Sequence, residues 1–294
     1  MSVISLSDLT FQQVEATFIN SDFFKSKNVN PLLSEVIVAN VFFEPSTRTR
    51  ISFEMAALRL GAKSILFNGK MGSSLEKDES FTDTVLNIGA MKPNIMIIRC
   101  GTDLDLPALN KQVSIPMINA GWGAKGHPTQ ALLDIATLRT KERNLSREKI
   151  LFVGDIKHSR VVASHLELSA HLGYQVAFCG PRDFIPSETK IPVFNTLKDG
   201  MAWATTVYFL RVQKERHQED GAGLEKKPES FQLNSESLKY LKSDDLFMHP
   251  GPVNWGVEMT SDVLKDSRSL ILDQVNQGVY MRMALIYLVS KGEL

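Results

Sequence analysis

The chain has 294 residues, of which 43% are apolar and 22% are charged, an ordinary globular mixture. Its 33 Lys and Arg residues balance 33 Asp and Glu residues, which argues against a nucleic-acid or membrane-surface partner. Two cysteines exclude a disulfide framework, no apolar run reaches the ~18 residues of a membrane span, and the N-terminus lacks a secretory pattern. We therefore expect a cytoplasmic protein.

Short apolar runs alternate with segments of helical periodicity along the chain. In the first half we expect strands at 36–43, 64–67, 94–99 and 115–119, and helices at 47–60, 81–91 and about 128–141. In the second half we expect strands at 150–153, 175–178, 206–210 and 245–248, and helices at 159–172 and about 277–289. This alternation predicts an α/β fold of parallel sheets flanked by helices.

The length exceeds what one hydrophobic core usually serves, so we expect two domains. The chain leaves the first sheet on a long helix near residue 128. We place the first domain at 1–128 and the second at 129–276. The apolar positions of the closing helix must be buried, and we expect residues 277–294 to pack back on the first domain.

The segment Phe43-Glu44-Pro45-Ser46-Thr47-Arg48-Thr49-Arg50 lies where the first expected strand meets a helix. Helix N-termini carry free N–H groups and the positive end of a dipole, and arginine matches phosphate oxygens bidentately. An ordinary hydroxyl cap beside solvated arginines is the competing interpretation. The position at the carboxyl end of a strand, where α/β folds bind ligands, favours a phosphate site.

Arg99 ends the strand at 94–99, and His127 and Gln130 flank the start of the helix near Pro128. Taken singly, Arg99 could be a rim charge and His127 a capping or core residue. The carboxyl ends of parallel strands meet at one edge, so these segments are expected to join the phosphate site.

Gly121 to Gly126 (GWGAKG) matches the G-x-G-x-x-G pattern of dinucleotide-binding folds. A nicotinamide-dependent oxidoreductase is therefore one rival interpretation. The expected acidic residue at the end of a following strand is missing, since residues 140–142 close a charged helix. We attribute these glycines to loop flexibility.

In the second half, Arg160 follows one strand, while Arg211 and Gln213 follow another. Two arginines at strand ends suggest a second pocket, suited to a dicarboxylate, although either alone could be an ordinary surface partner. The segment His249-Pro250-Gly251-Pro252 closes a third strand. We find no metal-ligand spacing, cofactor site, Ser-His-Asp or Cys-His arrangement, so an acyl-type transfer would need an activated donor.

Two segments resemble motifs of the aspartate and ornithine carbamoyltransferase family. The first, FFEPSTRTRISFEMAALRLGA, resembles the family's carbamoyl phosphate signature, and the second, HPTQALLDI, resembles its second motif. GDIKHSR, LRVQKER and HPGPVN resemble the aspartate branch. An ornithine enzyme would carry an HCLP-type segment and an SMG segment, and neither occurs. The resemblance implies direct carbamoyl transfer from carbamoyl phosphate to L-aspartate, without covalent intermediate, in pyrimidine synthesis. It also implies a homotrimer with shared active sites and donor and acceptor domains that close on each other, and leaves a regulatory chain or dihydroorotase-type partner open.

The resemblance implies a role for each matching residue. The carbamoyl phosphate site would comprise Ser46, Thr47, Arg48, Thr49, Arg99, His127 and Gln130, with Ser74 and Lys77 reaching a neighbouring subunit's site. Of these, Thr49, Arg99 and His127 would be catalytic through the carbonyl oxygen, and Gln130 would contact the carbamoyl amide. The aspartate site would comprise Lys77, Arg160, Arg211, Gln213, Gly251 and Pro252.

The chain departs from the family pattern at two places. Asp78 stands where glycine is expected, and Trp255 stands where arginine is expected. The first places a negative charge beside Lys77. These departures leave a second rival open, a binding or scaffolding protein that keeps the fold without the activity.

Overall fold

The structure is a computed structural model, and it describes residues 2–27, 31–69, 73–212 and 228–294. The chain forms two compact units. Unit 1 comprises residues 1–136, 163–168 and 275–294, and unit 2 comprises residues 137–162 and 169–274. The expected domain division at 128 and 276 stays a prediction. In the described part of the chain, no helix is long and apolar enough to cross a membrane.

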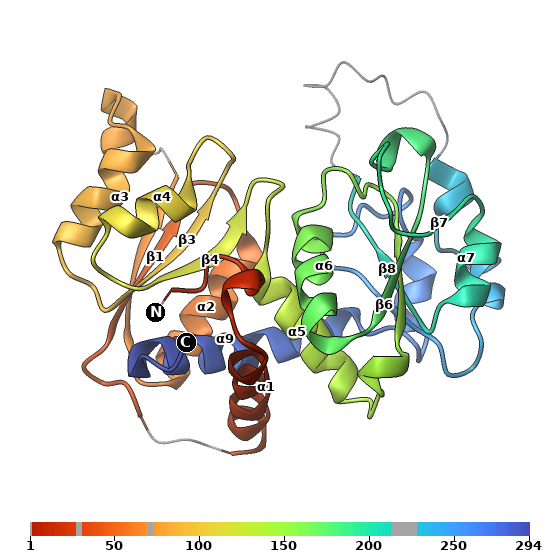
Figure 1. Cartoon of the computed structure of the whole chain (residues 1–294), viewed down its shortest axis with the longest axis horizontal. Helices are drawn as coiled ribbons and strands as arrows, with labels where there is room; N and C mark the ends of the chain where they lie inside the picture. Colours follow the sequence, from red (N-terminus) through yellow and green to blue (C-terminus); the bar gives the residue numbers. More distant parts are fainter. Residues whose placement is uncertain (1, 28–30, 70–72, 213–227) are drawn as a thin grey trace. The chain divides into compact units, whose positions relative to one another are not determined.

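Unit 1 is built on a four-stranded parallel sheet in the order β2-β1-β3-β4. Figure 1 labels three of these strands, β1, β3 and β4. Its strands are β1 (Ile37–Phe42), β2 (Lys63–Asn68), β3 (Ile95–Cys100) and β4 (Met117–Trp122). Its helices are α1 (Phe11–Ser26), α2 (Thr47–Arg59), α3 (Phe81–Ala90), α4 (Leu106–Gln112) and the start of α5 (Pro128–Arg139).

Helices cover both faces of this sheet because alternate residues of each strand point to opposite sides. On one face, Ala39 and Val41 pack in a buried cluster with Val85 of α3 and Leu109 of α4. The helix α2 packs against β1 and β2 and buries Phe53. The sheet therefore has a helical layer on each side, as the sequence predicts.

The last helix, α9 (Ile271–Lys291), packs on unit 1 with its residues from 275 onward. Tyr287 makes an edge contact with Phe24 of α1, with the ring centroids 5.6 Å apart. The Arg282 guanidinium lies 5.0 Å from the ring centroid of Phe53 in α2. The expectation that the closing helix packs on the first domain is confirmed, although the helix begins at Ile271 rather than near residue 277 (Figure 1).

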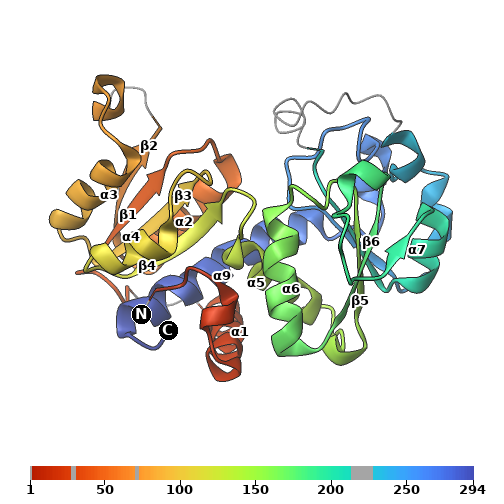
Figure 2. The ribbon, with the colours of Figure 1, turned by 45° about the horizontal axis from the view of Figure 1, so that its top comes forward.

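Unit 2 contains a five-stranded parallel sheet in the order β7-β6-β5-β8-β9. Its strands are β5 (Lys149–Val153), β6 (Gln175–Cys179), β7 (Val193–Phe194), β8 (Thr206–Phe209) and β9 (Leu246–Met248). Its helices include α7 (Leu197–Trp203) and the ends of α6 (Arg160–Leu172). Figure 2 shows α7 lying along one face of this sheet.

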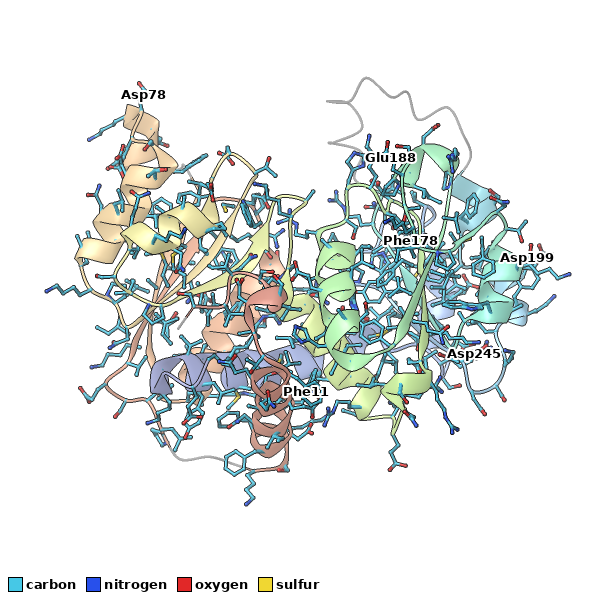
Figure 3. All side chains as sticks on the ribbon, viewed as in Figure 1. Phe11, Asp78, Phe178, Glu188, Asp199 and Asp245 are labelled. Carbon is cyan, nitrogen blue, oxygen red and sulfur yellow. The ribbon has the colours of Figure 1, made fainter. Side chains whose placement is uncertain are left out.

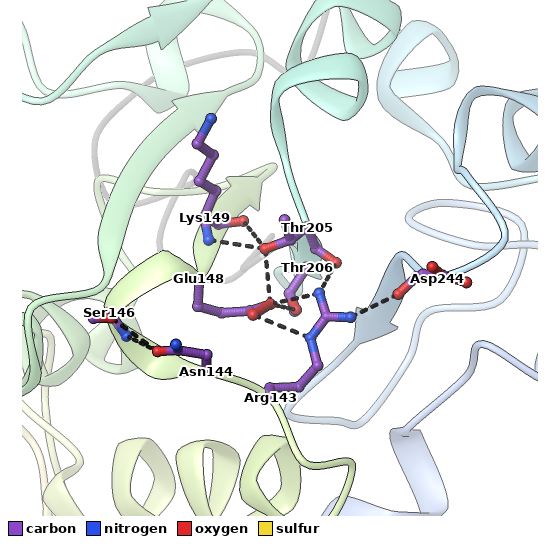
Figure 4. Close-up of polar contacts among 8 residues, drawn as sticks. All are labelled: Arg143, Asn144, Ser146, Glu148, Lys149, Thr205, Thr206 and Asp244. Carbon is purple, nitrogen blue, oxygen red and sulfur yellow. Dashed lines mark hydrogen bonds and ion pairs between the residues drawn. The ribbon is translucent and has the colours of Figure 1, made fainter.

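A buried carboxylate closes the amino edge of the second sheet (Figure 4). Both oxygens of Glu148 accept hydrogen bonds from Arg143, at 3.1 Å each. Its Oε1 also accepts from the hydroxyls of Thr205, at 2.8 Å, and Thr206, at 2.7 Å. Arg143 in turn donates to the backbone carbonyl of Asp244, at 2.8 Å. One ion pair therefore ties together the segments that begin β5, β8 and β9.

We expect Glu148→Gln to lower the free energy of unfolding by about 3 kcal/mol, because it leaves the Arg143 charge without its buried partner. Urea denaturation monitored by circular dichroism measures this change. The exposed Glu188 provides the control (Figure 3), and Glu188→Gln should change stability by less than about 0.5 kcal/mol. Equal stability of the two variants would contradict the structural role of Glu148.

Candidate active site

The segment between β1 and α2 forms the centre of the candidate site in unit 1. Ser46 is the N-cap residue of α2, and within residues 31–69 its side chain makes no capping hydrogen bond. Thr47 and Arg48 are exposed in the first helical turn, whereas Thr49 is buried. The first turn therefore combines free backbone N–H groups with hydroxyls and a cationic side chain, the arrangement that suits a phosphate group.

Arg99 lies beside this turn because β3 pairs with β1. Arg99 is in register with Phe42, and its carbonyl accepts a hydrogen bond from the N–H of Phe43, at 2.9 Å. Its Nε lies 3.7 Å from Glu44 Oε2, and its Nη1 donates to the carbonyl of Ala120 at 3.4 Å. The guanidinium is thus held at the carboxyl edge of the sheet, between the ends of β1 and β4.

His127 and Gln130 follow β4 at the same edge and are both buried. The N–H of His127 donates to Ser164 Oγ at 2.8 Å, and its Nδ1 lies 3.4 Å from Thr129 Oγ1. The Nε2 of Gln130 donates to Asp134 Oδ1 at 2.9 Å. Three strand ends that are distant in sequence therefore place hydroxyl, guanidinium, imidazole and amide groups along one edge of one sheet.

Ser74 and Lys77 do not belong to this edge within the chain. Both are exposed on a short 3-10 helix, η2 (Ser74–Lys77), which precedes α3. Asp78 follows with φ = 63°, a left-handed conformation in which glycine has no steric penalty, and it is labelled at the tip of this region (Figure 3). The backbone here thus has the shape that suits the glycine expected at this position.

The glycine-rich segment after β4 has a definite structural role. Gly121 and Gly123 have positive φ values of 125° and 48°. A Cβ at Gly123 would lie 2.1 Å from the side chain of Thr102, so no larger residue fits there. The turn is closed by the pairing of Trp122 with Gly126. Backbone conformation and close approach therefore explain these glycines better than the loop flexibility expected from the sequence.

In unit 2, Arg160 and Arg211 follow the neighbouring strands β5 and β8. Arg160 is the first residue of α6, after the cap residue Ser159, whose hydroxyl accepts from the N–H of Val162. Arg211 comes two residues after β8, and the N–H of Leu210 donates to the carbonyl of Val153, at 2.8 Å. Parallel pairing thus brings both arginines to the carboxyl edge of this sheet. Gln213 lies outside the described residues.

Glu258 is a functional candidate that sequence reasoning missed. Its Oε1 accepts from the N–H of Val212, at 2.8 Å, and its Oε2 accepts from the N–H of Asn254, at 2.6 Å. Burial raises the pKa of Glu258, and the hydrogen bonds from Val212 and Asn254 oppose this shift. Glu258 therefore joins the residue after Arg211 to the segment that contains Gly251 and Pro252. No local motif marks it, because its partners are distant in sequence.

The Gly251-Pro252 peptide bond is cis, and the N–H of Gly251 donates to Nδ1 of His249, at 2.8 Å. Pro252 is exposed and Gly251 is half-buried. Trp255, where arginine is expected, is 46% exposed. A large exposed aromatic ring next to this loop is a feature of this chain that its internal packing does not explain.

Two sequence profiles of one family match almost the whole chain. The carbamoyl-P binding domain of aspartate/ornithine carbamoyltransferases matches residues 1–140, and the Asp/Orn binding domain matches residues 146–289. The chain belongs to the aspartate/ornithine carbamoyltransferase family. The two matched domains correspond to the two halves of the chain that carry the candidate phosphate turn and the pair of arginines.

Known members of the family resemble the chain over nearly its full length. The aspartate carbamoyltransferase catalytic subunits of Pelobacter propionicus and Christiangramia forsetii are 38% and 39% identical, covering 99% and 98% of the chain and 97% and 96% of the relatives. The aspartate transcarbamoylase of Trypanosoma cruzi, solved with carbamoyl aspartate and phosphate, has a TM-score of 0.85 at 27% identity, covering 97% of this chain and 94% of that one. The ornithine carbamoyltransferase of Pyrococcus furiosus has a TM-score of 0.86 at 26% identity, covering 99% and 97%. The fold alone therefore does not separate the two acceptors.

We expect Arg48→Ala to weaken the binding of inorganic phosphate by about tenfold, because it removes a charge-assisted hydrogen bond at the start of α2. Isothermal titration with phosphate measures the effect. Arg59→Ala, in the last turn of the same helix, is the matched control and should leave phosphate affinity unchanged. Equal losses in both variants would place the phosphate elsewhere.

Proposed function

We propose that the chain transfers the carbamoyl group of carbamoyl phosphate to the α-amine of L-aspartate, releasing N-carbamoyl-L-aspartate and phosphate. The observation that carries this proposal is the pair of arginines, Arg160 and Arg211, at adjacent strand ends of unit 2. Two guanidinium groups suit the two carboxylates of aspartate. Ornithine, which carries a second amine, would need an acidic pocket. The relatives that are 38% and 39% identical are aspartate carbamoyltransferase catalytic subunits, which supports the same acceptor.

Unit 1 supplies the donor site of this proposal. The first turn of α2, with Ser46, Thr47 and Arg48, holds the phosphate and stabilises its charge as it leaves. Thr49, Arg99 and His127 donate hydrogen bonds to the carbonyl oxygen as it gains negative charge, and each such donor contributes about 3–4 kcal/mol when preorganised. A hydroxyl proton donated by Thr129 to Nδ1 of His127 would leave the ring proton on Nε2, which is then a donor.

The acceptor amine must be neutral when it attacks the carbamoyl carbon. The departing phosphate is the base in this proposal, because it gains charge as the C–O bond breaks. Arg160, Arg211, Gln213, Gly251 and Pro252 bind and orient the acceptor, with Lys77 adding positive charge. Positioning two reactants in this way supplies much of the rate without a protein nucleophile.

The function is tested by comparing acceptors on purified protein. We expect carbamoyl-aspartate to form from carbamoyl phosphate and aspartate, and no citrulline to form when ornithine replaces aspartate. Colorimetric detection of the ureido group follows both products. Activity with ornithine alone would contradict the acceptor assignment, and a folded protein inactive with both would favour the scaffolding alternative.

We expect His127→Ala to lower kcat by about 10²–10³-fold while changing the affinity for carbamoyl phosphate far less, because the carbonyl gains charge only in the transition state. Steady-state kinetics with a separate donor-binding titration measures this split. His171→Ala, in the last turn of α6, is the control. Normal turnover in His127→Ala would remove the imidazole from the mechanism.

The proposed assembly is a homotrimer whose sites take Ser74 and Lys77 from a neighbouring copy. An apolar stripe of unit 1 supports an interface, because Ile51, Met55 and Leu58 of α2 are 45%, 39% and 63% exposed at helical spacing. The edge strand β2 also exposes Ile65 and Leu66, by 48% and 47%, on opposite faces of the sheet because successive strand residues alternate. An exposed apolar stripe along a helix, as on α2, typically marks a protein interface. A regulatory chain or dihydroorotase-type partner and a cytoplasmic location stay predictions.

We expect Leu58→Glu to convert the trimer into single chains and to abolish most activity, because a charge in the apolar stripe opposes association. Light scattering coupled to gel filtration gives the mass. Leu272→Glu, which changes a 67% exposed leucine on α9 outside the stripe, should leave mass and activity unchanged. A wild-type protein that is active as a single chain would contradict the shared site.

A further inference from the structure

A buried carboxylate that the proposed mechanism does not use lies directly behind the donor site. Asp134, on α5, is fully buried, and its Oδ1 accepts a hydrogen bond from Nε2 of Gln130, at 2.9 Å. Its Oδ2 lies 3.1 Å from Nε2 of His165, which is also fully buried. Gln130 and Asp134 are four residues apart and therefore share one face of the helix.

The buried guanidinium of Arg282 interacts electrostatically with the carboxylate of Asp134. Arg282 of α9 is only 3% exposed, and its Nη1 donates to the carbonyl of Gly278, at 3.1 Å. Burial lowers the pKa of Arg282, and the attraction of Asp134 opposes that shift. Replacing buried ion pairs with apolar residues is often neutral or stabilising, so stability alone does not account for this cluster. Its contact with Gln130 points to a role in the donor site.

The contact determines which way the Gln130 amide faces. A carboxylate oxygen accepts hydrogen bonds and has no N–H to donate, so the NH2 group of Gln130 must face Asp134. The Oε1 of Gln130 then faces away from Asp134, and it accepts no hydrogen bond from the residues that the structure describes. Because Asp134 binds the NH2 group of Gln130, the side-chain atom that Gln130 offers to a bound substrate is its Oε1, a hydrogen-bond acceptor.

We propose that Asp134 makes the donor site selective for an acyl phosphate that carries an NH2 group, by fixing Oε1 of Gln130 as the acceptor for that group. This inference rests on the proposed function, in which Gln130 contacts the carbamoyl amide. The carbamoyl NH2 offers two donors and no strong acceptor, so a reversed Gln130 amide would set donor against donor. Acetyl phosphate, with CH3 in place of NH2, gains nothing from Oε1. Asp134 is thus a positioning residue that acts through Gln130.

The test compares these two acyl phosphates in the purified full-length enzyme. Selectivity is the ratio of Ki for acetyl phosphate to KM for carbamoyl phosphate at saturating aspartate. We expect Asp134→Asn to lower this ratio about tenfold, because His165 donates to the oxygen of residue 134, so the asparagine NH2 then faces Gln130 and turns its Oε1 away from the substrate. The Ki of inorganic phosphate should stay within about twofold of wild type, since α2 is untouched.

A double-mutant cycle separates positioning from general damage. Gln130→Met removes the amide, so adding Asp134→Asn to it should not lower selectivity further. Glu148→Gln, which changes a buried carboxylate of unit 2, is the stability control and should leave selectivity unchanged. Equal weakening of both acyl phosphates by Asp134→Asn, or a further loss of selectivity on the Gln130→Met background, would overturn the proposal.

If Asp134→Asn alone does not fold, the double variant Gln130→Glu with Asp134→Asn provides the test. It keeps the net charge of the pair, and the asparagine amide can donate to the new carboxylate, whose second oxygen is still an acceptor. Selectivity should then remain within about threefold of wild type, and a fall to the Gln130→Met level would contradict the proposal. A wild type unable to carbamoylate aspartate refutes the proposed function instead. An active wild type with unaltered selectivity in Asp134→Asn refutes only the role of Asp134.

Discussion

Because neighbouring strands in both sheets run parallel, each sheet collects the carboxyl ends of its strands, and the residues that follow them, at one edge. In unit 1 this edge carries the first turn of α2, Arg99 and the His127 segment, which come from three separate parts of the sequence. In unit 2 it carries Arg160 and Arg211. If the strands ran in alternating directions, the same sequence would no longer bring these residues together at one edge of each sheet. The parallel topology is therefore the condition on which the chemistry depends.

Such an edge gathers positive charge, and each sheet supplies carboxylates that hold the cationic and polar groups in position. Glu44 lies beside Arg99, Asp134 holds Gln130, and Glu258 joins the backbone next to Arg211 to the cis-proline segment. Glu148 differs, because its partners tie strand beginnings at the opposite, amino edge of its sheet. The carboxylates named here therefore have two roles, because three contact groups near the carboxyl edges of the sheets and Glu148 ties strand beginnings at the amino edge.

Much of this organisation follows from the sequence alone. Strands of continuous apolar residues and helices that begin at hydroxyl caps were predictable to within a few residues, as for α2, predicted at 47–60 and found at Thr47–Arg59. Helix α1 was not predicted, because its apolar residues lack clear helical spacing and its burial depends on partners such as Tyr287 at the far end of the chain. Glu258 and Asp134 were not predicted as site residues either, because no local sequence pattern marks them. Their significance lies in contacts made through tertiary structure, whereas the phosphate turn is a local feature that its own sequence reveals.

The absence of a nucleophile motif in the sequence and the abundance of fixed hydrogen-bond donors at the site lead to one mechanistic claim. In the proposed mechanism, the carbamoyl group passes directly from phosphate to the acceptor amine, without residing on the protein. Incubating the enzyme with carbamoyl phosphate and ³²P-labelled phosphate, in the absence of aspartate, measures this most directly. Direct transfer predicts that no label enters carbamoyl phosphate, because the C–O bond does not break until the amine attacks. Label incorporation at a rate comparable to turnover would contradict direct transfer, because it requires the C–O bond to break before the amine attacks.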